Sequence, residues 1–359
     1  MNETRASIPV VVLGGSGYVG GELLRLLSGH PVFRLAAVVS ESRGGAAVVD
    51  AFPFLRGTSL APASFSGFGD LGSMVSTHPS LGVFSALPHG ESAQRVDALL
   101  GLAERTGCEA RVVDLSADFR HREPDRYAAI YGKPHAAPQR LAEFVCGIPE
   151  LTAGTPRHVA HPGCFTTAAT LALAPLAAGG WIEPRATVVA VTGSTGAGRT
   201  PTATTHHPER RSNLFAYAPL AHRHEPEMRA LVAGAAHLAT EPEIAFVPHA
   251  GPFARGIHAT ITARLARQAD STTVRSAVSS FYGGLSPFVA VLDAPPHLQS
   301  VAGTNRCDLS YTVRGDELIA FSVLDNLVKG AAGGGVQLMN RLFDLPETAG
   351  LSLPGLGWL

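Results

Sequence analysis

A glycine-rich turn near the N-terminus constrains the fold of this chain more than any other feature. The turn, Gly14–Gly20, follows the continuous apolar run Ile8–Leu13 and leads into the amphipathic segment Gly21–Leu27. A second apolar run, Leu35–Val39, completes a strand–helix–strand unit typical of parallel sheets. Glycine at every third position of the turn permits close approach of a pyrophosphate and close packing of helix on strand. The pattern predicts a Rossmann-type dinucleotide-binding domain, with a purely structural turn as the alternative.

The end of the second strand bears on the choice of dinucleotide. Ser40 and Arg43 suit the 2′-phosphate of NADP, whereas Glu41 could accept from the free ribose hydroxyl of NAD. Both choices stay open at this point, and the segment favours NADP(H).

The second informative stretch surrounds Cys164. Pro162 and Gly163 interrupt an extended segment, and the small-residue run Ala168–Leu176 that follows is typical of a helix. Cys164 is therefore expected in the first helical turn, where unpaired N–H groups and the macrodipole favour a thiolate. A small buried core residue is the alternative for a cysteine that forms no recognised motif.

Composition limits the remaining possibilities. A chain of 359 residues is too long to fold around one ordinary hydrophobic core, so two domains are expected. A hydrophobic content of 45% and a net charge of −1 exclude a disordered chain and argue against a nucleic-acid binder. The four cysteines have neither zinc nor CxxC spacing, which favours reduced thiols in the cytoplasm. No apolar run reaches membrane-spanning length, and no signal peptide is evident.

The alternation of strands and helices changes character after about residue 150. Strands at Leu81–Leu87 and Arg111–Leu115 extend the first pattern, and their carboxyl ends carry His89, Ser116 and Arg120. Such ends line the ligand crevice of parallel sheets, although Asp118 and Arg120 could also cap and pair locally. Further elements indicate an α+β domain with a mixed or antiparallel sheet: strands at 186–191, 244–247, 257–264, 308–313 and 318–323, and helices at 273–282 and 325–343.

Cysteine beside a dinucleotide domain predicts redox chemistry at an acyl carbon. A thiolate can form a thioester that hydride from a nicotinamide reduces to an aldehyde. His222 and His224 are candidate bases, and Glu227, three residues after His224, could orient its ring. A capping box with surface histidines is the alternative, and metal binding by these residues with His206 and His207 lacks a recognised spacing.

Nine segments together resemble the N-acetyl-γ-glutamyl-phosphate reductase family. They cover nearly the whole chain in order: GGSGYVGGELLRLL (14–27), ALPHG (86–90), DLSADFR (114–120), GIPEL (147–151), HPGCFTTAATLALAPL (161–176), GSTGAGR (193–199), HRHEPE (222–227), RGI (255–257) and DNLVKGAAG (325–333). The resemblance implies an aspartate-semialdehyde-dehydrogenase-like fold. Its domains would be 1–155, completed by a C-terminal helix in 326–359, and a catalytic and dimerisation domain, 156–325. It also implies NADPH-dependent reductive dephosphorylation of an N-protected acyl phosphate.

The resemblance also implies roles for individual residues. Cys164 would be the nucleophile and His224 the acid–base, with His222 as the second choice. The expected cofactor residues are Gly14, Ser16, Gly17, Tyr18, Val19, Ser40, Arg43, Pro88 and Asn326, and the expected substrate residues are Ser116, Arg120, Ser194, Arg210 and Arg255. No metal, nucleic acid or membrane is expected, and the resemblance favours a homodimer or homotetramer.

One segment departs from the acetyl-glutamyl pattern. His206–Arg210, read as HHPER, looks more like the lysine-biosynthesis branch, whose glutamyl or aminoadipyl phosphate is tethered to an acidic amino-group carrier protein. Arg210, Arg211 and Arg223 would suit an acidic protein tail, although a solvated loop is equally compatible. The sequence therefore favours a carrier-linked substrate in amino-acid biosynthesis. The free acetylated substrate of arginine biosynthesis is the alternative, and a catalytically silent NADP-binding regulator is the remote one.

Overall fold

The computed structural model describes residues 7–283 and 286–357 and divides into two compact units. The first contains the chain up to Gly147 together with Ala153–His161 and Ala332–Ser352, and the second contains Ile148–Thr152, Pro162–Ala331 and the segment from Leu353. Over the described ranges, no helix is both long and apolar enough to cross a bilayer.

The first unit is a parallel sheet with strand order β3-β2-β1-β4-β5-β7-β6. In sheets with this strand order a dinucleotide binds between β1 and β4, where the order in which strands are added reverses. Its elements are β1 (Ile8–Leu13), α1 (Tyr18–Leu27), β2 (Phe33–Val39), α2 (Val48–Ala51), β3 (Phe65–Ser66), α3 (Leu71–Thr77), β4 (Ser80–Ser85), α4 (Ser92–Thr106), β5 (Glu109–Asp114), α5 (Pro124–Tyr131), β6 (Phe144–Cys146), β7 (His158–Ala160) and α10 (Gly333–Leu342).

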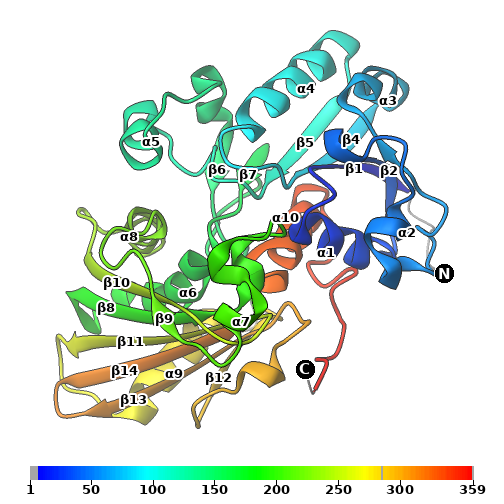
Figure 1. Ribbon diagram of the computed structural model, residues 1–359. Helices are drawn as coiled ribbons and strands as arrows, with labels where there is room; N and C mark the ends of the chain where they lie inside the picture. The colour runs from blue at the N-terminus through cyan, green and yellow to red at the C-terminus, as the bar shows by residue number, and fades with distance from the viewer. Residues whose placement is uncertain (1–6, 284–285, 358–359) are drawn as a thin grey trace, which may run out of the picture. The chain divides into compact units, whose positions relative to one another are not determined.

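Helices cover this sheet because its central strands are apolar on both faces. Val10–Leu13 of β1 are wholly buried, as a strand sandwiched between helices requires. Helices α3 and α4 pack together, and α1 packs against α10, which comes from the far end of the sequence. Figure 1 shows these two pairs on opposite sides of strands β1 and β4.

The second unit is a mixed sheet with strand order β12-β13-β14-β11-β8-β10-β9. β8 with β10 and β12 with β13 are parallel pairs, and the other neighbours are antiparallel. The elements are α6 (Cys164–Ala178), β8 (Ile182–Thr192), α7 (His207–Arg210), β9 (Phe215–Ala216), α8 (His224–Ala235), β10 (Glu243–Ala250), β11 (Ile257–Leu265), α9 (Ser271–Tyr282), β12 (Val289–Leu292), β13 (Cys307–Arg314) and β14 (Glu317–Leu324).

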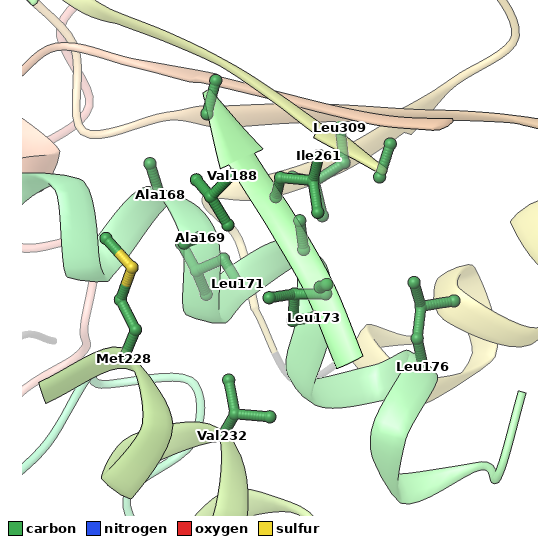
Figure 2. Packing of buried hydrophobic residues seen from close by; sticks show 14 of the residues in the cluster. Ala168, Ala169, Leu171, Leu173, Leu176, Val188, Met228, Val232, Ile261 and Leu309 are labelled. Carbon is green, nitrogen blue, oxygen red and sulfur yellow. The ribbon is translucent and has the colours of Figure 1, made fainter. Parts of the chain in front are cut away.

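Helix α6 forms the centre of the second unit. Every residue from Phe165 to Leu176 is buried, as expected for a helix that is apolar on all sides. Figure 2 shows Ala168, Leu171 and Leu173 of α6 between Val188 of β8 and Met228 of α8. Small alanine side chains let the helix lie close to the sheet, and this packing fixes the position of its first residue, Cys164.

The expected mixed second sheet is present, and several element boundaries differ from expectation. The polar segment before Asn213 contains the short helix α7, and β12 and α5 lie where no element was expected. The final helix begins with a π-helical turn, Val328–Ala332, before α10. The expected domain boundary lay after residue 155, whereas the contacts assign Ile148–Thr152 to the second unit and Ala153–His161 to the first.

Candidate active site

The glycine-rich turn of the first unit is held between two strands. Gly15 N–H donates to the Val39 carbonyl at 3.0 Å, and Ala86 N–H donates to the Leu13 carbonyl at 2.9 Å. Gly14 has φ +71°, and a Cβ there would lie 2.6 Å from the Ala86 oxygen, so only glycine fits. These contacts hold the glycine-rich turn in one conformation in front of helix α1.

The start of α1 fits the phosphates of a dinucleotide. Gly17 precedes the helix, and a Cβ there would meet only the Gly14 oxygen, at 3.9 Å, which leaves the backbone accessible. Tyr18 is exposed at the first turn, and Val19 follows it. The Ser40 hydroxyl donates to that of Ser16 at 2.9 Å, which joins the end of β2 to the turn. These residues fit a bound dinucleotide.

The segment after β2 forms a 3₁₀ turn, Glu41–Arg43. Arg43 is half-buried, whereas Glu41 is exposed and lies 4.0 Å from Arg95. Pro88 lies exposed after β4, beside His89, whose Nδ1 accepts from Ala117 N–H at 2.9 Å. The first unit thus places the expected cofactor residues at the carboxyl ends of β1, β2 and β4.

Ser116 and Arg120 have internal hydrogen-bond partners, and their expected contact with substrate stays a prediction. The Ser116 hydroxyl is buried and donates to Asp114 at 2.7 Å. Arg120 donates from Nε to the His161 carbonyl at 3.0 Å and from Nη2 to the Leu115 carbonyl at 3.2 Å. Asp118 accepts from Gly90 N–H and Ala93 N–H, which are distant in sequence, so it does not cap locally as the alternative supposed. These bonds hold the ends of the strands together.

In the second unit, a carboxylate holds the start of helix α6. Glu227 is 2% exposed, and its Oε2 accepts from Gly163 N–H at 2.9 Å and from the Thr166 hydroxyl at 3.0 Å. Cys164 follows Gly163 directly and is half-buried. These bonds make Glu227 an anchor for the helix that carries Cys164, and its expected role in orienting a histidine ring stays a prediction.

Both histidines of the HRH segment lie near this helix start. The His224 ring lies so close to Gly163 that a Cβ on the glycine would overlap its imidazole. His222 accepts the backbone N–H of His224 on Nδ1 at 3.1 Å, and the two ring centroids are 4.6 Å apart. Burial lowers the pKa of His222 to about 4; Arg223 acts in the same direction and Glu227 opposes. His222 is thus a neutral support for the segment, and His224 is the ring that lies against Gly163, the residue before Cys164.

A second glycine covers Cys164 from the opposite end of the sequence. A Cβ on Gly330 would lie 2.7 Å from Cys164 Cβ. Gly330 belongs to the π-helical turn, and its neighbour Lys329 forms a buried ion pair with Glu150 at 2.6 Å. Asp325 supports the same turn by accepting from Leu327 N–H at 2.8 Å. This packing leaves no room for a larger residue over the cysteine.

Asn326 and Arg255 lie close together, and both have internal partners. Asn326 Oδ1 accepts from Gly256 N–H at 2.6 Å, and its Nδ2 donates to the Thr195 hydroxyl at 3.0 Å. Arg255 Nε is 3.0 Å from Asp325 Oδ2. Ser194, half-buried, precedes Thr195 in the same glycine-rich loop. These contacts join residues 193–199, 255–257 and 325–333, three of the segments that carry the resemblance. The cofactor contact expected of Asn326 and the substrate contact expected of Arg255 stay predictions.

Arg210 is buried at the end of α7, with 8% of its surface exposed. Its Nη2 donates to the Thr192 carbonyl at 3.3 Å, and its guanidinium carbon lies 5.7 Å from the centre of the Phe215 ring. The neighbouring Tyr217 has a pKa raised first by burial and then by the nearby Cys164. The HHPER segment thus directs one arginine into the interior, while Arg211 remains exposed.

Comparisons with known proteins agree with this geometry. Residues 9–155 match the family model "Semialdehyde dehydrogenase, NAD binding domain", and residues 164–326 match "Semialdehyde dehydrogenase, dimerisation domain". An N-acetyl-gamma-glutamyl-phosphate reductase of Alkalilimnicola ehrlichii is 40% identical over 97% of this chain and 99% of its own. One from Dehalococcoides mccartyi is 39% identical over 95% of this chain and 96% of its own. The chain belongs to the N-acetyl-γ-glutamyl-phosphate reductase family.

Solved structures show the wider fold relationship of this reductase-family chain. Aspartate semialdehyde dehydrogenase II of Vibrio cholerae superposes with a TM-score of 0.69 at 15% identity, over 95% of this chain and 99% of that one. The enzyme of Candida albicans superposes with a TM-score of 0.65 at 18% identity, over 94% and 99% of the two chains.

Family membership confirms three expectations from the sequence. The chain resembles these reductases over its whole length, it has the two-part aspartate-semialdehyde-dehydrogenase-like fold, and it is an oxidoreductase that uses a nicotinamide dinucleotide. These relatives are named for the acetylated substrate, which was the alternative from the sequence. They do not support the carrier-linked substrate.

Several residues around Cys164 were not anticipated from the sequence. Thr166, Tyr217 and Asp325 support or surround the site, yet each lies in a segment where another residue drew attention. Gly163 could have indicated this packing in the sequence, because a glycine next to a reactive residue often marks the close approach of another group. Gly330 is a similar marker in the segment 325–333. Which group approaches could not be read from the spacing.

Proposed function

We propose that this protein catalyses the NADPH-dependent reduction of N-acetyl-γ-glutamyl phosphate to the semialdehyde, releasing inorganic phosphate. The observation that carries the proposal is Cys164 at the start of α6, beside the His224 ring, in a chain about 40% identical to reductases of that name. Four cysteines without a disulfide, all in the described part of the chain, suit a reducing compartment, and we place the enzyme in the cytoplasm.

The residues of the second unit supply covalent and acid–base chemistry. The thiolate of Cys164 attacks the acyl carbon, the carbon–oxygen bond to the phosphoryl group breaks, and phosphate leaves with the electron pair. The bound dinucleotide supplies the hydride that reduces the resulting thioester. His224 protonates the oxygen of the thiohemiacetal and then accepts that proton as the carbon–sulfur bond breaks and the aldehyde is released.

Three features support this assignment of roles. The Gly163 backbone lets the His224 ring lie beside the helix start, and Glu227 fixes that helix start through two hydrogen bonds. His222 accepts from the backbone of His224 and thereby positions it. NADPH, rather than NADH, is supported by Ser40 and Arg43 at the end of β2, where a 2′-phosphate would lie.

The test is turnover in the phosphorylating direction, measured with and without the Cys164 nucleophile. Wild-type enzyme should form NADPH from N-acetyl-glutamate semialdehyde, phosphate and NADP⁺, and Cys164→Ala should abolish this reaction while NADPH still binds. Retained turnover in Cys164→Ala would exclude the covalent mechanism. Binding of NADPH by a wild-type protein whose Cys164 reacts with neither acyl phosphate nor iodoacetamide would favour the silent regulator instead.

A carrier-linked acyl phosphate is the second candidate substrate, and the HHPER segment is the observation in its favour. Arg211 and Arg223 are exposed and available to an acidic carrier, whereas Arg210 is buried and is not. An Arg211→Ala, Arg223→Ala double variant should slow only the carrier-linked reaction. Equal loss with both substrates, or no turnover of the carrier-linked substrate by the wild type, would remove this candidate.

We also propose that the enzyme assembles as a homodimer or homotetramer through its second unit. The matched dimerisation model covers this unit, and one face of its sheet carries exposed apolar side chains, including Val189 and Ile319. An exposed apolar sheet face typically marks an association surface. Light scattering should give a multiple of the chain mass, and Val189→Glu should reduce it.

A further inference from the structure

The buried guanidinium of Arg210 differs from the other arginines expected at the site. Arg255 has the carboxylate of Asp325, and Arg120 has two backbone carbonyls. Arg210 has one carbonyl, that of Thr192, at the long distance of 3.3 Å. Its Nε is buried with no hydrogen-bond acceptor, and no carboxylate among residues 7–283 and 286–357 lies within ion-pair distance.

Such a cation is costly unless an anion is supplied from outside. A buried charge without a partner destabilises a fold by several kcal/mol, and natural sequences seldom retain one without a use. Burial lowers the pKa of Arg210, which shows the direction of this cost, and the guanidinium nevertheless stays protonated at neutral pH. The side chain is therefore poised to bind an anion rather than to stabilise the protein alone.

The position of Arg210 connects it to the reactive cysteine. Tyr217, two residues after Phe215, lies with its ring centroid 5.6 Å from that of His222. The His222 ring is in turn 5.7 Å from that of Phe165, the residue after Cys164. Cys164 and Arg210 also act in opposite directions on the pKa of Tyr217, which agrees with this proximity. The Phe215 ring flanks the guanidinium, and the Thr192 carbonyl holds one end of it. A planar guanidinium held in this way can donate two parallel N–H groups to two oxygens of a phosphate or carboxylate.

We propose that Arg210 forms an oxyanion subsite that binds the phosphate or the α-carboxylate of the substrate beside Cys164. The identity of the substrate rests on the proposed function. The binding of an oxyanion by Arg210 does not. Phosphate and carboxylate share the same bidentate chemistry, and the experiments below distinguish them.

Thermal stability tests the subsite without any turnover. Inorganic phosphate or N-acetylglutamate should raise the Tm of the wild type, and Arg210→Met should lose that response. Without ligand, Arg210→Met should be as stable as the wild type or more so, because an unpaired buried charge is replaced by an apolar chain of similar length. Arg267→Met is the matched control, since it removes an exposed cation that stacks on Trp181 in the same unit.

Kinetics in the phosphorylating direction identifies which oxyanion is bound. If Arg210 binds phosphate, Arg210→Met should raise the KM for phosphate about 10- to 100-fold and leave that for the semialdehyde unchanged. If it binds the carboxylate, the KM for the semialdehyde should rise instead. Arg210→Lys should recover part of the loss, because it restores the charge without the planar guanidinium.

Two outcomes would overturn the inference. One is an Arg210→Met protein that is markedly less stable than the wild type, or fails to fold, which would give Arg210 a structural role. The other is an unchanged Tm response and unchanged KM values for both substrates. A wild type that responds to phosphate through Arg210 but does not turn over the acetylated substrate would contradict the proposed function and leave the subsite standing.

Discussion

Two helix starts in this molecule share a local pattern and differ in what lies against them. Helix α1 follows Gly17 and helix α6 follows Gly163, and each glycine has extended backbone before the first turn. At α1 the first turn carries no acidic residue, and a Cβ on Gly17 would meet only one atom within 4 Å. At α6 the carboxylate of Glu227 already accepts from the Gly163 N–H.

The function of a helix N-terminus therefore depends on the groups that the fold places against it. The start of α1 is open to the phosphates of a bound dinucleotide. The start of α6 has its own internal anion, so the macrodipole acts on Cys164 together with an opposing negative charge. The helix position alone therefore favours a Cys164 thiolate less than the sequence implied. The nearby His224 ring becomes the more important group for the ionisation of Cys164.

The largest expected effect tests the contact between Gly163 and His224. Gly163→Ala should lower kcat about 100-fold or more, because its methyl group displaces the imidazole from the reactive cysteine. NADPH affinity, measured by calorimetry, should not change. Gly234→Ala is the matched control: it lies in α8 with no atom within 4 Å, and it should keep full activity and gain about 0.5–1 kcal/mol of stability. A Gly163→Ala enzyme with normal kcat would remove His224 from the mechanism.

Acid should weaken both units through buried histidines. Burial lowers the pKa of His30 and His158 in the first unit, and of His222 near the second helix start, to about 4. The unfolded chain binds protons below pH 6.5 that the folded chain does not, so stability falls between pH 6.5 and 4 by about 2 kcal/mol per histidine. Asp114, whose pKa burial raises to about 6, opposes this fall below pH 6.

Urea midpoints between pH 7 and 4 measure this effect and assign part of it to His222. His222→Asn keeps an acceptor for the His224 backbone N–H and should flatten the loss of stability. His206→Asn, at an exposed position, should leave the pH profile as in the wild type. Identical profiles for the wild type and His222→Asn would show that His222 is not buried in solution.

The open helix start can be tested with two neighbouring glycines. Gly14→Ala should cost roughly 2 kcal/mol or more of unfolding free energy, because of its positive φ and the clash with the Ala86 backbone. Gly17→Ala should leave stability within about 0.5 kcal/mol and weaken NADPH binding about tenfold, because its Cβ occupies the approach of the phosphates. Denaturation and calorimetry separate the two effects. Unchanged affinity in Gly17→Ala would contradict dinucleotide binding at α1.

The smallest effect concerns the internal anion at α6. Glu227→Gln keeps an acceptor for Gly163 and Thr166 but removes the charge. The pH profile for iodoacetamide reaction of Cys164 should move to lower pH by about half a unit. Glu225→Gln, in the same first turn but paired with Arg229, should leave the profile unchanged. A shift to higher pH would mean that Glu227 promotes the thiolate through a neighbouring histidine.

Local patterns sufficed for most of the elements and for the candidate residues. The apolar run Ile8–Leu13 and the glycines after it specify a strand, a turn and a helix, because steric limits act within a few residues. Cys164 was correctly expected at a helix start for the same reason. Several short elements were missed, because short segments carry too little periodicity to be distinguished from loops. They are α2, α3, α5, α7, β3, β6, β9 and β12.

The fold class, the dinucleotide turn and the position of Cys164 at a helix start follow from the sequence, since each depends on local backbone preference or on the alternation of apolar residues. Which polar groups meet depends on how the distant segments pack. This packing brings Glu227 to Gly163, Gly330 to Cys164 and Asp325 to Arg255, across separations of 64 or more residues. It also buries Arg210, whose neighbours in sequence are exposed. The Glu227–Gly163 bond follows from the packing of α6 against α8, and all these contacts depend on long-range packing that no local signal encodes.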